Sequence, residues 1–232
     1  MLDKPLAGKK IAVVVESKYI PEEIKAYKYC FGLLGAKVDL ISRLYYGSYA
    51  PGDEGWTSAV FYSDVDPNEQ KPWETPEMLA MEDNKDVSRI NLDDYAALIM
   101  SANYTSVRLR YTDDTEISDA RSFVQSAPVV RFFAEAMGRK DLVKGLLCHG
   151  LWILTPNRDL LKSRRVTCHT VVMADILNTD AHIVFEKDEN GKSAPAKVVT
   201  DGDLVTGFSK DEVVPFIEAI ALQISMMQTR VH

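Results

Sequence analysis

Residues 10–15 read KIAVVV, and this short run of mostly β-branched residues has the composition of a buried parallel strand. The run stops at Glu16, and Pro21 then opens a predicted helix that ends at Gly35. Residues 36–41, AKVDLI, form the next predicted strand. A strand, a helix and a second strand in this order predict a parallel sheet with a right-handed crossover.

Strand and helix signals alternate again in the second half of the chain. Residues 96–100 (AALIM) and 143–147 (VKGLL) are apolar strands, and the helix predicted between them begins at Pro128 and has one apolar face. Extended segments then surround turn sequences at 188–191 and 201–202, which predicts β-hairpins. The sequence therefore predicts an α/β fold with a mostly parallel central sheet and a C-terminal β-hairpin region.

Residues 46–90 interrupt this alternation. The segment is rich in glycine, proline and aromatic residues and shows little periodicity, which is typical of a functional excursion. We expect a packed surface loop, an oligomer contact or a lid over the active site. Since 232 residues suit one sizeable domain, residues 1–232 are expected to form a single domain with this long insertion.

Composition argues against several classes of function. The formal net charge of −7 disfavours non-specific binding to nucleic acid or to an anionic membrane surface. No apolar stretch approaches the ~18 residues that a membrane span needs. The first residues also lack the apolar core of a signal peptide. We therefore expect a cytoplasmic protein with neither a nucleic-acid nor a membrane partner.

The three cysteines, Cys30, Cys148 and Cys168, are too few and too irregularly spaced for a disulfide framework or a zinc site. No histidine pair has metal-ligand spacing, and no glycine-rich dinucleotide motif or phosphate loop is present. We therefore expect reduced thiols, no metal and no cofactor. Cys30 is predicted to lie in the core, and Cys168 and the adjacent His169 are predicted to be structural.

The chemistry is predicted at Cys148, within the segment GLLCHG at residues 145–150. An apolar strand ends at the cysteine, and Gly150 lets the chain turn sharply into a helix, as at the nucleophile elbow of hydrolases. A thiol beside a helix N-terminus is expected to have a lowered pKa. Neighbouring backbone N–H groups could bind an oxyanion, and His149 is the candidate proton donor or acceptor.

Two further segments end at the same edge of the predicted sheet. Glu16 follows the first strand, and Ser101 and Ala102 follow the strand at 96–100. In open α/β sheets, ligands bind outside the carboxyl ends of the strands. We therefore expect these three residues to converge with Cys148 on one crevice.

Three of these features together resemble the PfpI/ThiJ (DJ-1/PfpI) superfamily. They are the Cys148-His149-Gly150 triplet after an apolar strand, Glu16 after the first strand, and the segment LKSRRVTC at residues 161–168. The resemblance implies a flavodoxin-like three-layer sandwich of the class I glutamine amidotransferase-like type. It also implies a homodimer or a higher homo-oligomer.

The resemblance further implies roles for the candidate residues. Cys148 would be the nucleophile, Glu16 a protonated carboxyl hydrogen-bonded to its sulfur, and His149 the proton shuttle. Backbone N–H groups near Ala102 and His149 would form the oxyanion and substrate-binding site, which Ser101 and Gly150 flank.

The sequence departs from the family pattern at two places. Ser101-Ala102 replaces a frequent Gly-Gly pair, and Ser106 lies near the position of a glutamate in peptidase-type members. The acid that orients His149 therefore stays open; Asp175 or an acid from residues 46–90 could take this role.

The predicted function is a cysteine-dependent, cofactor-independent enzyme that acts on a small-molecule electrophile. A glyoxalase III or deglycase-like activity on 2-oxoaldehydes is the first hypothesis. A cysteine hydrolase or hydratase for amides, peptides or isocyanides is the second. A redox-sensing or chaperone stress protein with an oxidisable Cys148 is the third, from a different class.

Overall fold

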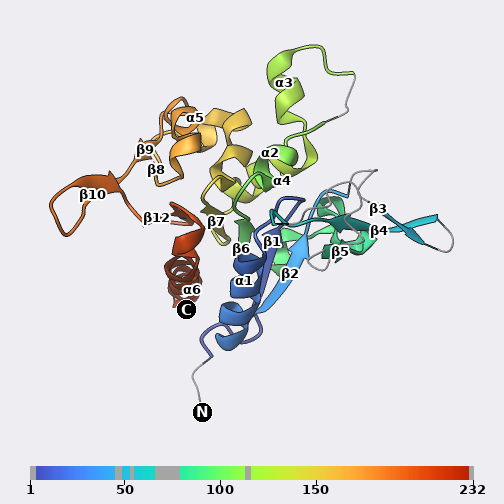
Figure 1. The fold of residues 1–232 in the computed structure, drawn as a ribbon, viewed down its shortest axis with the longest axis horizontal. Coiled ribbons are helices and arrows are strands. Elements are labelled where there is room, and N and C mark those ends of the chain that lie inside the picture. Colours follow the sequence, from blue (N-terminus) through green and yellow to red (C-terminus); the bar gives the residue numbers. More distant parts are fainter. Residues whose placement is uncertain (1–3, 45–48, 53–54, 66–78, 113–115, 230–232) are drawn as a thin grey trace.

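The computed structural model describes residues 4–44, 49–52, 55–65, 79–112 and 116–229. Its centre is a six-stranded sheet (Figure 1) made of β1 (Lys10–Val14), β2 (Lys37–Ile41), β6 (Ala97–Met100), β7 (Val143–Leu147), β12 (Val198–Asp201) and β13 (Leu204–Gly207). The strand order is β12-β13-β7-β6-β1-β2. All neighbouring strands are parallel except β12, which pairs antiparallel with β13. The predicted, mostly parallel sheet is therefore confirmed.

Helices cover both faces of this sheet. The α-helices are α1 (Pro21–Leu33), α2 (Thr105–Arg108), α3 (Ala120–Gln125), α4 (Pro128–Gly138), α5 (Met173–Leu177) and α6 (Val213–Thr229). Ile11 and Val13 of β1 lie in a core with the apolar faces of α1 and α6, whereas Ala12 and Val14 lie in a second core with α4. Because successive side chains of a strand point to opposite faces, a continuous apolar run builds both cores. The three-layer, flavodoxin-like sandwich is thus confirmed.

A buried ion pair joins the start of β7 to the turn between β12 and β13. Lys144 is fully buried, and its ammonium donates to the carboxylate of Asp203 and, at 2.6 Å, to the carbonyl of Arg139. Asp203 also accepts a 2.8 Å hydrogen bond from Arg164. These three hydrogen bonds offset the cost of burying the two charges.

Residues 46–90 contain more regular structure than predicted. Three short strands, β3 (Tyr49–Gly52), β4 (Gly55–Phe61) and β5 (Leu79–Met81), form a separate antiparallel sheet. Inter-strand pairing, which leaves no signal in a local window of sequence, is the reason that the segment looked irregular. Residues 45–48, 53–54 and 66–78 of the insertion lie outside the described part, so a lid function stays a prediction.

The C-terminal hairpin region is present, with altered boundaries. β10 (Phe185–Lys187) pairs antiparallel with β11 (Ser193–Pro195), and this hairpin extends away from the central sheet at the left of Figure 1. β9 (His182–Ile183) instead pairs parallel with β8 (Arg165–Val166). The extended segment predicted before the 188–191 turn is therefore divided between two partners. No described helix is both long and apolar enough to cross a membrane.

Candidate active site

Cys148 stands on a strained turn directly after β7. Its φ angle is 59°, in the left-handed region that residues other than glycine rarely adopt. Its backbone N–H donates to the carbonyl of Gly207 on β13 at 2.8 Å. A Cβ added to Gly150 would lie 3.1 Å from the carbonyl oxygen of Met100, so the turn packs closely against the end of β6. The local geometry is that of a nucleophile elbow.

Cys148 and His149 form a close pair. The sulfur lies 3.1 Å from Nδ1 of His149, and the two residues are only 6% and 8% exposed. Burial, followed by the nearby His169, lowers the pKa of His149 to about 4, so the imidazole is neutral at physiological pH. The thiol can therefore donate its hydrogen to Nδ1.

The expected lowering of the cysteine pKa is wrong for this structure. Burial raises the pKa of the Cys148 thiol to about 11, and the nearby Glu23 carboxylate adds to the rise. The backbone N–H groups of Asn103 and His149 act in the opposite direction, with a smaller effect. The chain after the elbow forms only a four-residue 3₁₀ helix, η5 (Gly150–Ile153), whose dipole is too short to outweigh burial.

Aromatic rings surround the His149 imidazole. Tyr104 stacks on it at 5.4 Å between ring centroids, and Trp152 and His169 lie at 5.3 Å and 5.0 Å. Within the described part of the chain, Nε2 of His149 is buried without a hydrogen-bond partner. His169 was predicted to be structural, but its ring is part of the wall around the Cys148–His149 pair. The sequence carries no local signal for this role of His169, because only the fold brings its ring to that of His149.

A buried carboxyl that the sequence did not reveal lies close to the thiol. Glu23, in the first turn of α1, is 1% exposed and accepts hydrogen bonds from the Tyr27 hydroxyl at 2.7 Å and the Ala102 N–H at 3.0 Å. Burial raises the pKa of Glu23 to about 7, and the charge of Asp64 adds to this effect. Glu23 is therefore partly protonated at neutral pH and influences Cys148 through space.

Glu16 occupies the expected edge of the sheet but makes different contacts. Its carboxylate accepts from the N–H of Ser17 at 2.7 Å and lies 3.7 Å from Nε of Arg108. No hydrogen bond joins it to Cys148 in the described chain, so the predicted contact with the sulfur is not found. Burial of Glu16 raises its pKa, which the charge of Arg108 partly counteracts.

Two of the residues predicted at the oxyanion site are engaged elsewhere. The N–H of Ala102 points to Glu23, and the Ser101 hydroxyl donates to Thr105 at 3.1 Å. Both residues are fully buried. The N–H groups that act on the sulfur are those of His149, which was expected, and of Asn103, the neighbour of Ala102.

The acid expected to orient His149 is not found among the described residues. Asp175 accepts a 2.7 Å hydrogen bond from the indole N–H of Trp152, and so touches the ring wall rather than the imidazole. Ser106 donates its hydroxyl to the backbone carbonyl of His149 at 2.9 Å. The pair of Cys148 and His149 therefore has no third, acidic member in this part of the structure.

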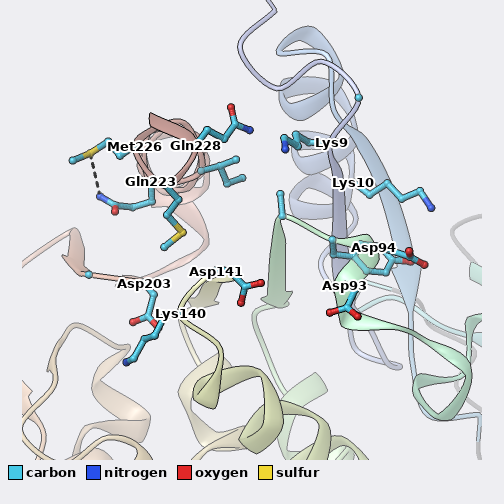
Figure 2. Close-up of a pocket in the computed structure, with 16 residues that line it drawn as sticks. Lys9, Lys10, Asp93, Asp94, Lys140, Asp141, Asp203, Gln223, Met226 and Gln228 are labelled. Carbon is cyan, nitrogen blue, oxygen red and sulfur yellow. Dashed lines mark hydrogen bonds and ion pairs between the residues drawn. The ribbon is translucent and has the colours of Figure 1, made fainter. Parts of the chain in front are cut away.

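A cavity of about 950 Å³ lies at the opposite, amino end of the strands (Figure 2). Side chains of both signs line it, including Lys9, Asp94 and Lys140, together with Gln223 and Met226 of α6. Ligands of open α/β sheets bind at the carboxyl ends, where Cys148 lies. Among the residues that the structure describes, no group of three His, Cys, Asp or Glu side chains is placed to hold a metal.

These features define an α/β sandwich with a cysteine on a nucleophile elbow. The model of the DJ-1/PfpI family matches residues 117–223, a stretch that includes Cys148, His149 and Gly150. The resemblance found in the sequence is therefore confirmed for this part of the chain. No curated protein sequence matches the chain.

Solved structures extend the likeness to nearly the whole chain, as a likeness of fold. A two-domain protein with DJ-1/ThiJ/PfpI-like and ferritin-like domains from Anabaena variabilis is 17% identical, with a TM-score of 0.66 over 93% of this chain. The chain spans about half, 48%, of that protein. A ThiJ/PfpI domain protein from Brachyspira murdochii is 15% identical, with a TM-score of 0.62, over 95% of this chain and 98% of its own. DJ-1beta of Drosophila melanogaster is 12% identical, with a TM-score of 0.60, over 97% of both chains.

Proposed function

We propose that this protein is a cysteine-dependent, cofactor-independent enzyme that converts 2-oxoaldehydes to 2-hydroxy acids. The observation that carries the proposal is the 3.1 Å contact between the Cys148 sulfur and Nδ1 of His149 on the strained turn after β7. A thiol beside a neutral imidazole can transfer its proton as it attacks, which is the arrangement that covalent catalysis requires.

In the first step, the Cys148 sulfur forms a bond to the aldehyde carbon. The thiol proton passes to Nδ1 of His149 and then to the former carbonyl oxygen, which gives a neutral hemithioacetal. This route suits the site because it leaves no charge behind, and burial here disfavours both a thiolate and an imidazolium.

In the second step, His149 removes the proton from C1, and a proton returns at C2 through an enediol. The hemithioacetal thereby becomes the thioester of a 2-hydroxy acid. Water then cleaves the thioester, which releases the acid and restores the thiol. The overall change is one oxoaldehyde plus one water to one hydroxy acid, so no external oxidant or reductant is needed.

Glu23 supports this chemistry as a nearby buried carboxyl. Ionised Glu23 raises the pKa of Cys148, as like charges in a buried site do. Protonated Glu23 does not exert this repulsion, so protonation of the carboxyl favours negative charge on the sulfur. We therefore propose that Glu23, rather than Glu16, is the buried carboxyl whose protonation state tunes the thiol.

The test is lactate formation from methylglyoxal by the wild-type protein, Cys148→Ala and Cys30→Ala. Cys30 is half-buried on α1 and serves as the matched control. We expect activity in the wild type and in Cys30→Ala, and a loss of at least about a hundredfold in Cys148→Ala. Absence of lactate with the wild-type protein refutes the proposed substrate class.

A panel of amide, peptide and isocyanide substrates tests the alternative reactions. The lack of an acid bonded to His149 among the described residues favours isomerisation, since hydrolases with such pairs generally orient the base with a third group. Faster turnover of any panel substrate than of methylglyoxal would replace this proposal with hydrolysis or hydration.

We further propose that residues 1–232 act as one domain and assemble as a homodimer or higher homo-oligomer. Sedimentation velocity at micromolar concentration tests the assembly. A single species with the mass of one chain contradicts it.

A further inference from the structure

Asp64 belongs to the insertion and is tied to the loop after β1. Its N–H donates to the carbonyl of Tyr19 at 2.9 Å, and the preceding residue, Ser63, forms a β-bridge with the same tyrosine. The N–H of Lys18 donates to the carbonyl of Tyr62 at 2.8 Å. These contacts fix the backbone of Asp64 beside the loop after β1.

The Asp64 carboxylate contacts the residue that acts on the catalytic sulfur. Oδ2 accepts a 3.4 Å hydrogen bond from Nδ2 of Asn103. Asn103 has a φ of 66°, and its backbone N–H is one of two main-chain groups that lower the pKa of the Cys148 thiol against the larger effect of burial. We propose that Asp64 is a positioning residue, which holds Asn103 in its left-handed conformation so that the Asn103 N–H points to the sulfur.

Backbone strain supports this assignment. The left-handed conformation is unfavourable for residues other than glycine, although asparagine tolerates it better than most. Such a conformation persists when contacts outside the residue hold it. The side-chain hydrogen bond to Asp64 is a contact of this kind, and it acts at the residue whose N–H direction matters.

The second oxygen of Asp64 gives independent support. Among the described residues, Oδ1 is buried and has no hydrogen-bond partner. A buried carboxylate oxygen without a donor costs stability, so a purely structural role explains the residue poorly. Functional sites are where such costs are commonly retained.

The charges around Asp64 link it to the buried carboxyl of the site. Burial raises the pKa of Asp64; Lys210 and Lys18 counteract this rise, and Glu22 adds to it. Asp64 in turn contributes to the raised pKa of Glu23. Removal of the negative charge at Asp64 should therefore lower the pKa of Glu23, whichever neutral residue replaces the aspartate.

Two substitutions separate the hydrogen bond from the charge. Asp64→Asn and Asp64→Ala both remove the charge, but only asparagine keeps an oxygen that can accept from Asn103. The inference rests on the proposed function only for the turnover measurement. The main assay is alkylation of Cys148 by iodoacetamide, followed by peptide mass spectrometry, which needs no substrate.

We expect Cys148 in Asp64→Ala to alkylate about tenfold more slowly than in Asp64→Asn at the same pH, since loss of one aimed donor costs that much or more. Methylglyoxal turnover should show the same ratio in kcat, with little change in KM. Glu186→Gln, on the remote β10 hairpin, is the control for charge and should match the wild type.

A further pair tests whether the effect passes through Asn103. Glycine at position 103 adopts the left-handed conformation without a hydrogen bond to residue 64. In an Asn103→Gly background, Asp64→Asn and Asp64→Ala should therefore give equal alkylation rates of Cys148. Equal rates for Asp64→Asn and Asp64→Ala in the native background overturn the inference. If alkylation follows the expected order but the wild type makes no lactate, the inference stands and the proposed function fails.

Discussion

The raised pKa of Glu23 makes the stability of this protein depend on pH in a specific way. The carboxyl is 1% exposed, and burial raises its pKa from 4.5 to about 7. The folded protein therefore binds this proton more tightly than the unfolded chain does. The corresponding stabilisation is fully present below about pH 4.5 and is lost as the pH rises through about 7.

The magnitude follows from the same two values. A pKa that rises from 4.5 to about 7 corresponds to roughly 3 kcal/mol of unfolding free energy. Glu23→Gln removes the titration but keeps an oxygen that can accept from Tyr27 and Ala102. Relative to this variant, the wild type should lose roughly 3 kcal/mol between about pH 4.5 and pH 8.

Urea unfolding of both proteins across this pH range measures the difference directly. Taking the difference cancels the titration of the other groups, provided that they do not couple to Glu23. Glu186→Gln is the matched control, because Glu186 is exposed on the β10 hairpin. A difference between wild type and Glu23→Gln that stays constant within about 0.5 kcal/mol over the range refutes the reasoning.

Two other predictions concern the thiol and the buried ion pair. Burial raises the pKa of Cys148 to about 11, so its alkylation rate should rise about tenfold per pH unit from pH 7 to 10. An alkylation rate that becomes constant below pH 8 contradicts the raised pKa. Asp203→Ala leaves Lys144 buried with only the Arg139 carbonyl as acceptor, so urea unfolding should show a loss of roughly 3–5 kcal/mol, and a loss under about 1 kcal/mol is the contrary outcome.

The alternation of apolar strands and helices predicted the architecture because it reflects local rules. Residues 11–15 of the KIAVVV run are buried on both faces, and such runs occur in parallel strands covered by helices. The cysteine, histidine and glycine at 148–150 likewise predicted the elbow, since a strand followed by a sharp turn depends on adjacent residues. Antiparallel pairing within residues 46–90 was missed, because it depends on partners that lie apart in the chain.

The sequence by itself determined the sheet, the elbow and the Cys148–His149 pair. Only the tertiary structure decided which carboxyl approaches the thiol. In the sequence, Glu23 is one of two acidic residues that suit the first turn of a helix, and nothing local distinguishes it from Glu22. The fold buries Glu23 and joins it by a hydrogen bond to Ala102, 79 residues away, whereas Glu16 forms an ion pair with Arg108. Burial and charge are sums over the whole fold, and for this reason the direction of the Cys148 pKa also followed from the structure alone.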